Sequence, residues 1–350
     1  MSVIVPAFRA ASMLPATLGA LVASSLPRES WELILVDDGS DDDTPFVATR
    51  YADRVIRLPG RANGPAFARN RGAHAARGEL LAFIDADVVV HHDTLERLAE
   101  SFRYSNVSAV FGAYDEQPAA QGIVSRYRNL MHHYVHTINA GDAETFWAGC
   151  GAVRRNVFEV VGGFDEQRYR QPQIEDIELG HRIRDIGGRV VLDAGIQCTH
   201  LKHWSLRGMV MSDIRHRGVP WVELLLEERG NRSRVTTLNL QPSEKIYTIF
   251  VCAAVPLLLL GIVLQKGLLA IVAAVLIAVV IIGNARLLGW FWNRHGAAMT
   301  LAAIPLRLVQ YLINGISVAW GVTKHMMQRG SATRRDRSPI AFTGNSGQLG

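Results

Sequence analysis

The distribution of apolar residues divides the chain into two regions, and this division restricts the fold more than any other feature. Before about residue 240, short apolar segments alternate with polar ones, as in water-soluble domains. From Ile246 onward the apolar residues form runs long enough to cross a bilayer. The segment "NLQPSEK", residues 239–245, separates the two regions. We therefore expect a globular domain followed by a membrane region.

The first region alternates strand-like and helix-like segments. Strands are expected at "SVIVPAF", "WELILVDDGS", "RVIRL", "ELLAFIDAD" and "VSAVFGAY", and helices at 13–24, 44–51, 66–76 and 93–102. This βαβα rhythm predicts an α/β domain with a Rossmann-like, mostly parallel sheet and helices on both faces. In such sheets, ligands bind at the carboxyl ends of the strands.

Acidic residues stand where two of these strand-like runs end. Asp37 and Asp38 follow "LILV", and Asp85 and Asp87 follow "LLAFI". An Asp-x-Asp pair can hold a divalent cation, because hard cations prefer carboxylate oxygen. A cation held in this way keeps positions open for a substrate pyrophosphate. The same short pattern also occurs in solvated turns, so it needs support from its neighbours.

That support comes from an ordered set of segments. "SVIVPAFRA", "ILVDDGSDDDT", "ARNRGA", "FIDAD", "GGFDE" and "IEDIELGHRIRDIGG" occur in this order within residues 2–225. Together they resemble glycosyltransferase family 2, the inverting nucleotide-sugar enzymes with a GT-A fold. The resemblance implies a catalytic domain over residues 1–238, with a nucleotide-sugar half at 1–115 and an acceptor half with interfacial helices at 116–238.

The resemblance also implies a donor site for a nucleoside diphosphate sugar, with a UDP-sugar as the expected donor. The residues that it places there are Pro6, Ala7, Asp37, Asp38, Arg69, Asp85, Ala86, Asp87 and Arg217. Arg69 would approach the pyrophosphate or the base. Asp85 and Asp87 would hold Mg²⁺ or Mn²⁺ against the diphosphate, Asp87 the more directly. The ion would offset the charge that develops on the leaving nucleoside diphosphate.

The Glu175-Asp176 pair has two interpretations. An acidic first turn complements a helix dipole and is common for that reason alone. The position after "GGFDE" makes Asp176, by resemblance, the general base, with Glu175 as the second candidate. Inversion by direct displacement needs a base that takes the proton of the acceptor hydroxyl.

Further candidates come from the second half of the domain. By resemblance, His200 completes the metal or phosphate site; otherwise it is a structural hydrogen-bonding residue. "RHRGVPW" is an imperfect match to the Arg/Gln-x-x-Arg-Trp element of lipid-acceptor relatives, in which Arg217 would contact the diphosphate and Trp221 the acceptor. A basic amphipathic helix near the membrane is the alternative. Trp147 is the other acceptor candidate.

Three histidines in "NLMHHYVH" could suit a metal, but no further acid completes the set. This segment is therefore interpreted as an interfacial helix. The three residues are His132, His133 and His136.

The membrane region is expected over residues 246–322. A helical hairpin is predicted at 246–288, because only Gln265 and Lys266 separate two apolar runs. A third helix at 300–322 has a polar face, with Arg307 on it. The positive-inside tendency favours two spans and an amphipathic helix lying at the interface. A third span with its polar face against the catalytic domain is the alternative.

The tail at 323–350 is basic and is predicted to be disordered. It contributes to a net charge of +5 and is expected to lie on an anionic cytoplasmic membrane face. Nucleic acid is not an expected partner, because no basic stripe interleaved with aromatic residues occurs in the first region. Three cysteines without metal or disulfide spacing, and no signal peptide, suggest a catalytic domain in the cytosol and a multi-pass protein of the cytoplasmic (inner) membrane.

The acceptor follows from the acid pair. A phosphate oxygen is already ionised at neutral pH and needs no general base, so the base-like Asp176 favours a hydroxyl acceptor. That hydroxyl would belong to a membrane lipid, a glycolipid or a lipid-linked saccharide, and polyprenyl phosphate is the alternative. A non-catalytic scaffold would be expected to lack Asp87 or Asp176, and both are present.

Overall fold

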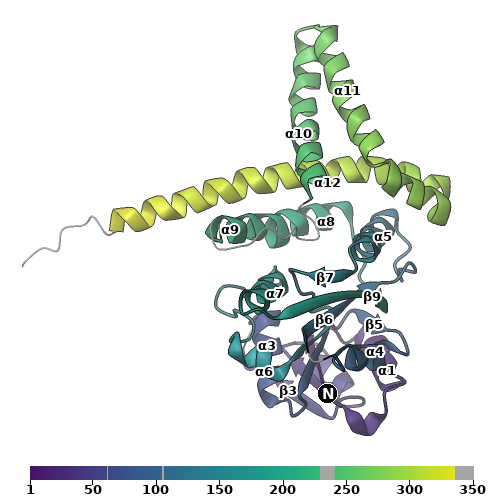
Figure 1. Ribbon diagram of the computed structural model, residues 1–350, viewed down its shortest axis with the longest axis vertical. Coiled ribbons are helices and arrows are strands. Elements are labelled where there is room, and N and C mark those ends of the chain that lie inside the picture. The colour runs from purple at the N-terminus through teal and green to yellow at the C-terminus, as the bar shows by residue number, and fades with distance from the viewer. Residues whose placement is uncertain (61, 105, 229–240, 336–350) are drawn as a thin grey trace, which may run out of the picture.

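The computed structural model describes residues 1–335 apart from residues 61, 105 and 229–240. Its core is a nine-stranded sheet with the order β3-β2-β1-β4-β8-β6-β9-β5, and β7 pairs with β9 (Figure 1). The strands are β1 Ser2–Ala7, β2 Glu32–Asp37, β3 Arg54–Arg57, β4 Leu80–Ile84, β5 Val88–Val90, β6 Val107–Tyr114, β7 Gly141–Ala143, β8 Cys150–Arg154 and β9 Arg189–His200.

The predicted α/β class is confirmed, but the parallel arrangement holds mainly in the first half of the chain. Strands β1 to β4 are parallel neighbours, as the βαβα rhythm predicted. β8 enters antiparallel between β4 and β6, and β5 and β7 pair antiparallel with β9. The sheet is therefore mixed, because the second half of the chain no longer alternates strand and helix.

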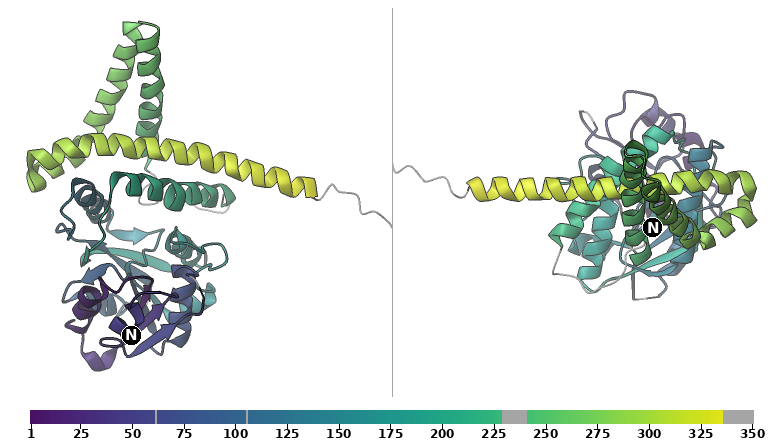
Figure 2. Two further views of the ribbon diagram at one scale, coloured as in Figure 1. Left: turned by 180° about the vertical axis from the view of Figure 1, so that it is seen from behind. Right: turned by 90° about the horizontal axis from the view of Figure 1, so that it is seen from above.

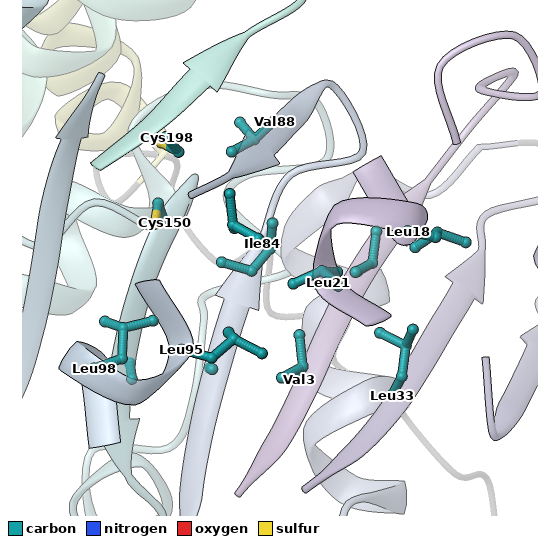
Figure 3. Packing of buried hydrophobic residues seen from close by; sticks show 14 of the residues in the cluster. Val3, Leu18, Leu21, Leu33, Ile84, Val88, Leu95, Leu98, Cys150 and Cys198 are labelled. Atoms are coloured by element: carbon teal, nitrogen blue, oxygen red, sulfur yellow. The ribbon is translucent and has the colours of Figure 1, made fainter. Parts of the chain in front are cut away.

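Both faces of the sheet are covered. Successive β1 residues point to opposite sides, so that Val3 and Val5 join one hydrophobic core and Ile4 joins the other. Figure 3 shows the first core, where Leu18 and Leu21 of α1 lie over Leu33 and Val3 of the sheet. The helices of this part are α1 Leu14–Val22, α2 Thr44–Ala48, α3 Pro65–Ala75, α4 Thr94–Ser101, α5 Ile123–Ile138, α6 Arg155–Val160 and α7 Glu175–Asp185.

A helical layer lies between the sheet and the C-terminal helices. It consists of α8 Leu206–Ser212, the π-helical turn η2 Asp213–Gly218 and α9 Val219–Glu227 (Figure 1). Helix α12 packs on η2 and α9, where Lys324 Nζ is 2.8 Å from Glu223 Oε2. This layer places the α/β domain next to the apolar part of the chain.

The C-terminal region contains α10 Pro242–Val263, α11 Gly267–Gly283 and α12 Ala285–Arg335. Helices α10 and α11 form the predicted hairpin, which projects away from the sheet, while α12 runs across the base of the hairpin (Figures 1 and 2). By length and composition, α10 and residues 285–328 of α12 are candidate membrane spans, and α11 is a shorter apolar helix. The crosswise course of α12 is the one expected of a helix lying at the interface.

The C-terminal tail differs from the prediction. Residues 323–335, predicted to be disordered, continue α12, and residues 336–350 lie outside the described part. Contact with α9 supports this extension, since Gly321 lies against Val222 and Lys324 pairs with Glu223. A bend at Gly296, whose φ of 79° suits glycine, separates the first turns of α12 from the rest.

Candidate active site

The Asp85-Ala86-Asp87 turn connects β4 to β5 at the edge of the sheet. Two backbone contacts fix it: Asp85 N donates to Gly149 O at 3.1 Å, and Leu201 N donates to Asp87 O at 2.9 Å. These partners belong to the segments that precede β8 and follow β9. Segments that come later in the chain therefore hold the two carboxylates that the sequence places at the end of β4.

Arg69 links this turn to the second acid pair. Its guanidinium lies 2.7 Å from Asp85 Oδ1 and 2.8 Å from Glu175 Oε1, and its side chain is only 5% exposed. Charge-assisted contacts of this kind hold both carboxylates in place. In the structure, Arg69 thus forms ion pairs with two acids of the protein itself. Its contact with a pyrophosphate or base stays a prediction.

Asp176 differs from its neighbour Glu175 in its partners. Glu175 is bound by Arg69 and by the backbone N–H of Gln173, at 2.9 Å. Asp176 accepts hydrogen bonds from Ala148 N and Ile177 N and makes no ion pair with the described residues. Burial and the charge of Glu175 raise the pKa of Asp176 to about 7, although Arg69 opposes the shift. A carboxylate with a pKa near neutrality is suited to accept a proton.

Asp87 and Asp85 have opposite electrostatic environments. His200 Nε2 is 3.4 Å from Asp87 Oδ2, and the Tyr114 ring stacks on His200 with the centroids 4.5 Å apart. Burial would raise the pKa of Asp87, but the hydrogen bond and charge of His200 lower it overall. Burial raises the pKa of Asp85, and the nearby Asp87 adds to this increase. Asp87 is therefore the more readily ionised of the two.

The acids fit a divalent cation that shares its ligands with a substrate. Within the described ranges, no group of three or more His, Cys, Asp or Glu side chains is arranged to hold a metal ion. Mg²⁺ is commonly bound by one or two carboxylates together with substrate phosphates. Asp85 and Asp87, with His200 beside them, match that chemistry and would hold the ion against a diphosphate.

One cavity of about 1530 Å³ brings the predicted residues together. Those that line it are Pro6, Ala7, Asp38, Arg69, Asp85, Ala86, Asp87, Trp147, Glu175, Asp176, His200, Arg217 and Trp221. Asp37 is not among the lining residues. Its side chain is fully buried within β2, where it accepts from Ser40 N and lies 3.7 Å from Arg57 Nε.

Asp38 supports the donor end of the cavity. Its carboxylate accepts from Asn63 N and from Gly64 N at 2.7 Å. Gly64 has a φ of 102°, and a Cβ there would lie 2.5 Å from Arg170 O, so the turn before α3 requires glycine. Asp38 thus fixes the loop that leads into the helix carrying Arg69.

Arg217 and Trp221 both line the cavity, although three residues separate them and the Arg/Gln-x-x-Arg-Trp element has its arginine and tryptophan adjacent. Arg217 stands in η2 and Trp221 in α9, four residues apart, which places them on the same helical face. Single π-helical turns inserted in α-helices are frequent at functional sites. The Arg217 side chain is exposed toward the cavity, and the ring of Trp221 packs against the second core.

The histidines of α5, a helix expected to be interfacial, lie on its side that faces the sheet. His133 and His136 hydrogen-bond the carbonyls of Tyr114 and Gly112 in β6, and both side chains are buried. The His132 ring lies 4.2 Å from the Tyr114 ring and 4.7 Å from the Trp147 ring, centroid to centroid. Burial lowers the pKa of His132, which favours a neutral ring in the cavity wall. The i, i+4 spacing of His132 and His136 was the sequence feature that could have placed both rings on one side of α5.

Part of the chain is similar in sequence to known proteins. Residues 2–162 match the model of the family described as Glycosyl transferase family 2. Glycosyltransferase AglE of Haloferax volcanii is 32% identical over 172 residues, which cover 47% of this chain and 55% of AglE. UDP-Glc:alpha-D-GlcNAc-diphosphoundecaprenol beta-1,3-glucosyltransferase WfgD of Escherichia coli is 30% identical over 116 residues, which cover 33% of this chain and 45% of WfgD. The chain thus spans about half the length of these relatives.

A solved structure extends the likeness to most of the chain. The mannosyltransferase PcManGT from Pyrobaculum calidifontis, in complex with GDP-Man and Mn²⁺, superposes with a TM-score of 0.57. The sequences are 20% identical, and the match covers 92% of this chain and 86% of PcManGT. This likeness shows the GT-A fold. Within residues 2–162, the sequence is similar to glycosyl transferase family 2, and the structural likeness shows the fold alone.

Proposed function

We propose that this protein is an inverting, metal-dependent glycosyltransferase. It moves a sugar from a nucleoside diphosphate sugar to a hydroxyl of a membrane lipid, a glycolipid or a lipid-linked saccharide. The observation that carries the proposal is the continuity of the cavity, which extends from Asp85, Asp87 and Asp176 to the start of α10 and the polar face of α12. A single space joins the acids to the base of the apolar hairpin.

The donor end supports a nucleoside diphosphate sugar held through Mg²⁺ or Mn²⁺. Asp85 and Asp87 would hold the ion, and the ion would supply Lewis-acid stabilisation of the leaving diphosphate. PcManGT, which shares the fold, has Mn²⁺ and GDP-Man in its complex, and WfgD is named for UDP-Glc. A UDP-sugar is the donor that we propose, and Arg217 faces the same space as a cation for the diphosphate.

Asp176 is the proposed general base. The acceptor oxygen forms a bond to the anomeric carbon while the bond from that carbon to the diphosphate oxygen breaks. The proton of the hydroxyl passes to the Asp176 carboxylate, and the nucleoside diphosphate leaves. Glu175 is committed to Arg69 and to Gln173 N, so it positions the site and leaves Asp176 free for the proton.

The apolar hairpin supports a membrane-embedded acceptor. Large apolar side chains of α10 and α11 are exposed along the hairpin, including Leu259 at 58% and Ile271 at 61%. Soluble proteins rarely expose apolar surface of this extent. We propose that the hairpin inserts into the cytoplasmic membrane, with the catalytic domain on the cytosolic side and α12 at the interface.

The first experiment is nucleoside diphosphate release by the purified protein in lipid nanodiscs. A panel of sugar nucleotides is supplied with Mg²⁺ or Mn²⁺, with and without a total bacterial lipid extract. Release that requires both the metal and the extract is the expected result, and it identifies the donor. Donor binding by calorimetry without release under any condition would support a non-catalytic role. Faster release with pure polyprenyl phosphate than with the extract would support the phosphate acceptor instead.

A further inference from the structure

The outer end of the cavity carries a second charged cluster, remote from the acids. Lys245 lies in the first turns of α10, and Arg286 and Arg307 lie in α12; all three line the same cavity. We call these three residues the basic collar. The α8–α9 layer separates the collar from the sheet edge, where the catalytic acids lie (Figure 1).

Pairing inside the collar is incomplete. Arg307 Nη2 lies 2.6 and 2.8 Å from the two oxygens of Glu244, and Arg307 Nε donates to Asn284 Oδ1 at 3.1 Å. Lys245 and Arg286 are exposed and line the cavity, and no acidic side chain of the described part of the chain forms an ion pair with either. Among these residues, only Arg307 is therefore paired with a carboxylate, that of Glu244.

Building on the proposed function, we infer that the acceptor is a saccharide joined to its lipid through a phosphate or diphosphate, which the basic collar binds. Lys and Arg bind phosphate oxygens with charge-assisted hydrogen bonds, which are stronger than neutral ones. The collar stands at the base of the apolar hairpin, where a bilayer would place the junction between lipid chain and head group. A lipid phosphate at this position would have its chain beside the hairpin.

The position of the collar argues against a phosphate that acts as the nucleophile. A nucleophilic phosphate would have to lie beside Asp176, whereas Lys245 and Arg286 belong to the opposite end of the cavity. The stretch between the two ends is lined by polar and aromatic side chains, among them Asn129, His216 and Trp221. A volume of about 1530 Å³ also exceeds the roughly 300–1,000 Å³ typical of a site for one small molecule. One or more sugars would fill this middle stretch.

The test uses two acceptors that differ only in their charge. One is a monosaccharide linked through diphosphate to a polyprenyl chain, and the other is the same monosaccharide linked directly to the same polyprenol. Transfer is measured in nanodiscs of phosphatidylcholine for the wild type and for the double variant Lys245→Gln/Arg286→Gln. Lys266→Gln is the matched control, since this lysine lies at the tip of the same hairpin and does not line the cavity.

For the double variant we expect KM for the diphosphate acceptor to rise roughly 10- to 30-fold. KM for the uncharged acceptor should be unchanged, and Lys266→Gln should match the wild type with both. The inference is overturned if the wild type uses the two acceptors equally well. It is also overturned if the double variant raises both KM values together, which would mean that the collar binds bulk lipid head groups.

Three outcomes separate this inference from the proposed function. If the uncharged acceptor is glycosylated as fast as the charged one, the inference fails while the transferase remains. If neither saccharide acceptor is used and polyprenyl phosphate is, the inference fails and the alternative acceptor replaces the proposed one. If no acceptor of any class is glycosylated although the donor binds, the proposed function itself fails.

Discussion

The two ends of the cavity differ in the sign of their charged side chains: acids outnumber bases at the inner end, and bases outnumber acids among the residues of the outer end. At the inner end, one buried arginine stands among four carboxylates: Asp85, Asp87, Glu175 and Asp176. At the outer end, the carboxylate of Glu244 pairs with Arg307, and two further cations, Lys245 and Arg286, line the same cavity. Each central ion neutralises only part of its surroundings. Among these residues, the excess charge is negative where a divalent cation is proposed and positive where a lipid phosphate is proposed.

The comparison shows how one cavity can receive two substrates from opposite sides. In the proposed function, a negative inner end would attract a metal and, through it, the diphosphate of the donor. In the further inference, a positive outer end would attract the phosphate of an acceptor that arrives from the membrane. Removing charge at each end should therefore produce different defects. Chemistry should fail at the inner end, and acceptor binding or local stability should fail at the outer end.

The largest effect is expected at the metal site. Asp87→Ala should lower the rate of transfer by about 10⁴-fold, because it removes the more readily ionised of the two proposed metal ligands. Mn²⁺ affinity, measured by calorimetry with the donor present, should fall in parallel. Asp93→Ala is the control, since Asp93 is nearly half exposed and pairs with Arg97 outside the cavity. Normal turnover by Asp87→Ala would exclude the metal assignment.

The second effect separates binding from chemistry at the same end. Asp176→Asn should lower kcat by about 10³-fold, the size typical of a lost general base. Donor affinity should stay close to that of the wild type, because Asp176 is not proposed to touch the diphosphate. Glu175→Gln should reduce kcat less and should also reduce thermal stability, since it removes the carboxylate charge that pairs with buried Arg69. The reverse order of the two kcat losses would assign the base to Glu175.

At the outer end, breaking the central pair should lower stability. Glu244→Gln leaves Arg307, whose side chain is 14% exposed, without its carboxylate. The expected cost is about 2 kcal/mol of unfolding free energy, within the range for a charge that loses its partner. Thermal unfolding in detergent micelles measures it. The double variant Glu244→Gln/Arg307→Met should recover part of the loss, and equal losses in the single and double variants would contradict the pairing.

The smallest effect is a dependence on pH at the inner end. Asp176 accepts a proton only when ionised, and its pKa is raised to about 7. As pH falls below 7, kcat/KM should decrease about tenfold per unit, because the base becomes protonated in the free enzyme. Above pH 8 the profile should be level. A profile without this limb between pH 5 and 8 would show that Asp176 titrates elsewhere or does not act as the base.

Much of the inner end was predictable from local sequence. Asp85 and Asp87 follow a buried strand, and Glu175 and Asp176 open a helix, so short patterns locate all four. The ion pairs through which Arg69 joins Asp85 to Glu175 were not predictable from such patterns. Arg69 is 16 residues from Asp85 and 106 from Glu175, and only the packing of α3 against the sheet brings the three together.

The limits of local patterns also explain the corrections. Asp37 and Asp38 are equivalent in sequence, but the register of β2 buries Asp37 and leaves Asp38 at the cavity wall. The sequence did not show which side of α5 carries its histidines; in the structure His133 and His136 bond to carbonyls of β6. The tail residues 323–335 looked unstructured from their composition, and contact with α9 coincides with the extension of α12.

The sequence by itself determined the division into an α/β domain and an apolar region, the strand-end acids, and the hairpin. Each of these depends on periodicity or composition within a short segment, where neighbours along the chain are neighbours in space. Only the tertiary structure decided that one cavity joins the acids to the hairpin, and that Glu244, Asn284 and Arg307 meet at its outer end. Those contacts depend on how separate helices pack, because the residues that form them lie 23 or more positions apart.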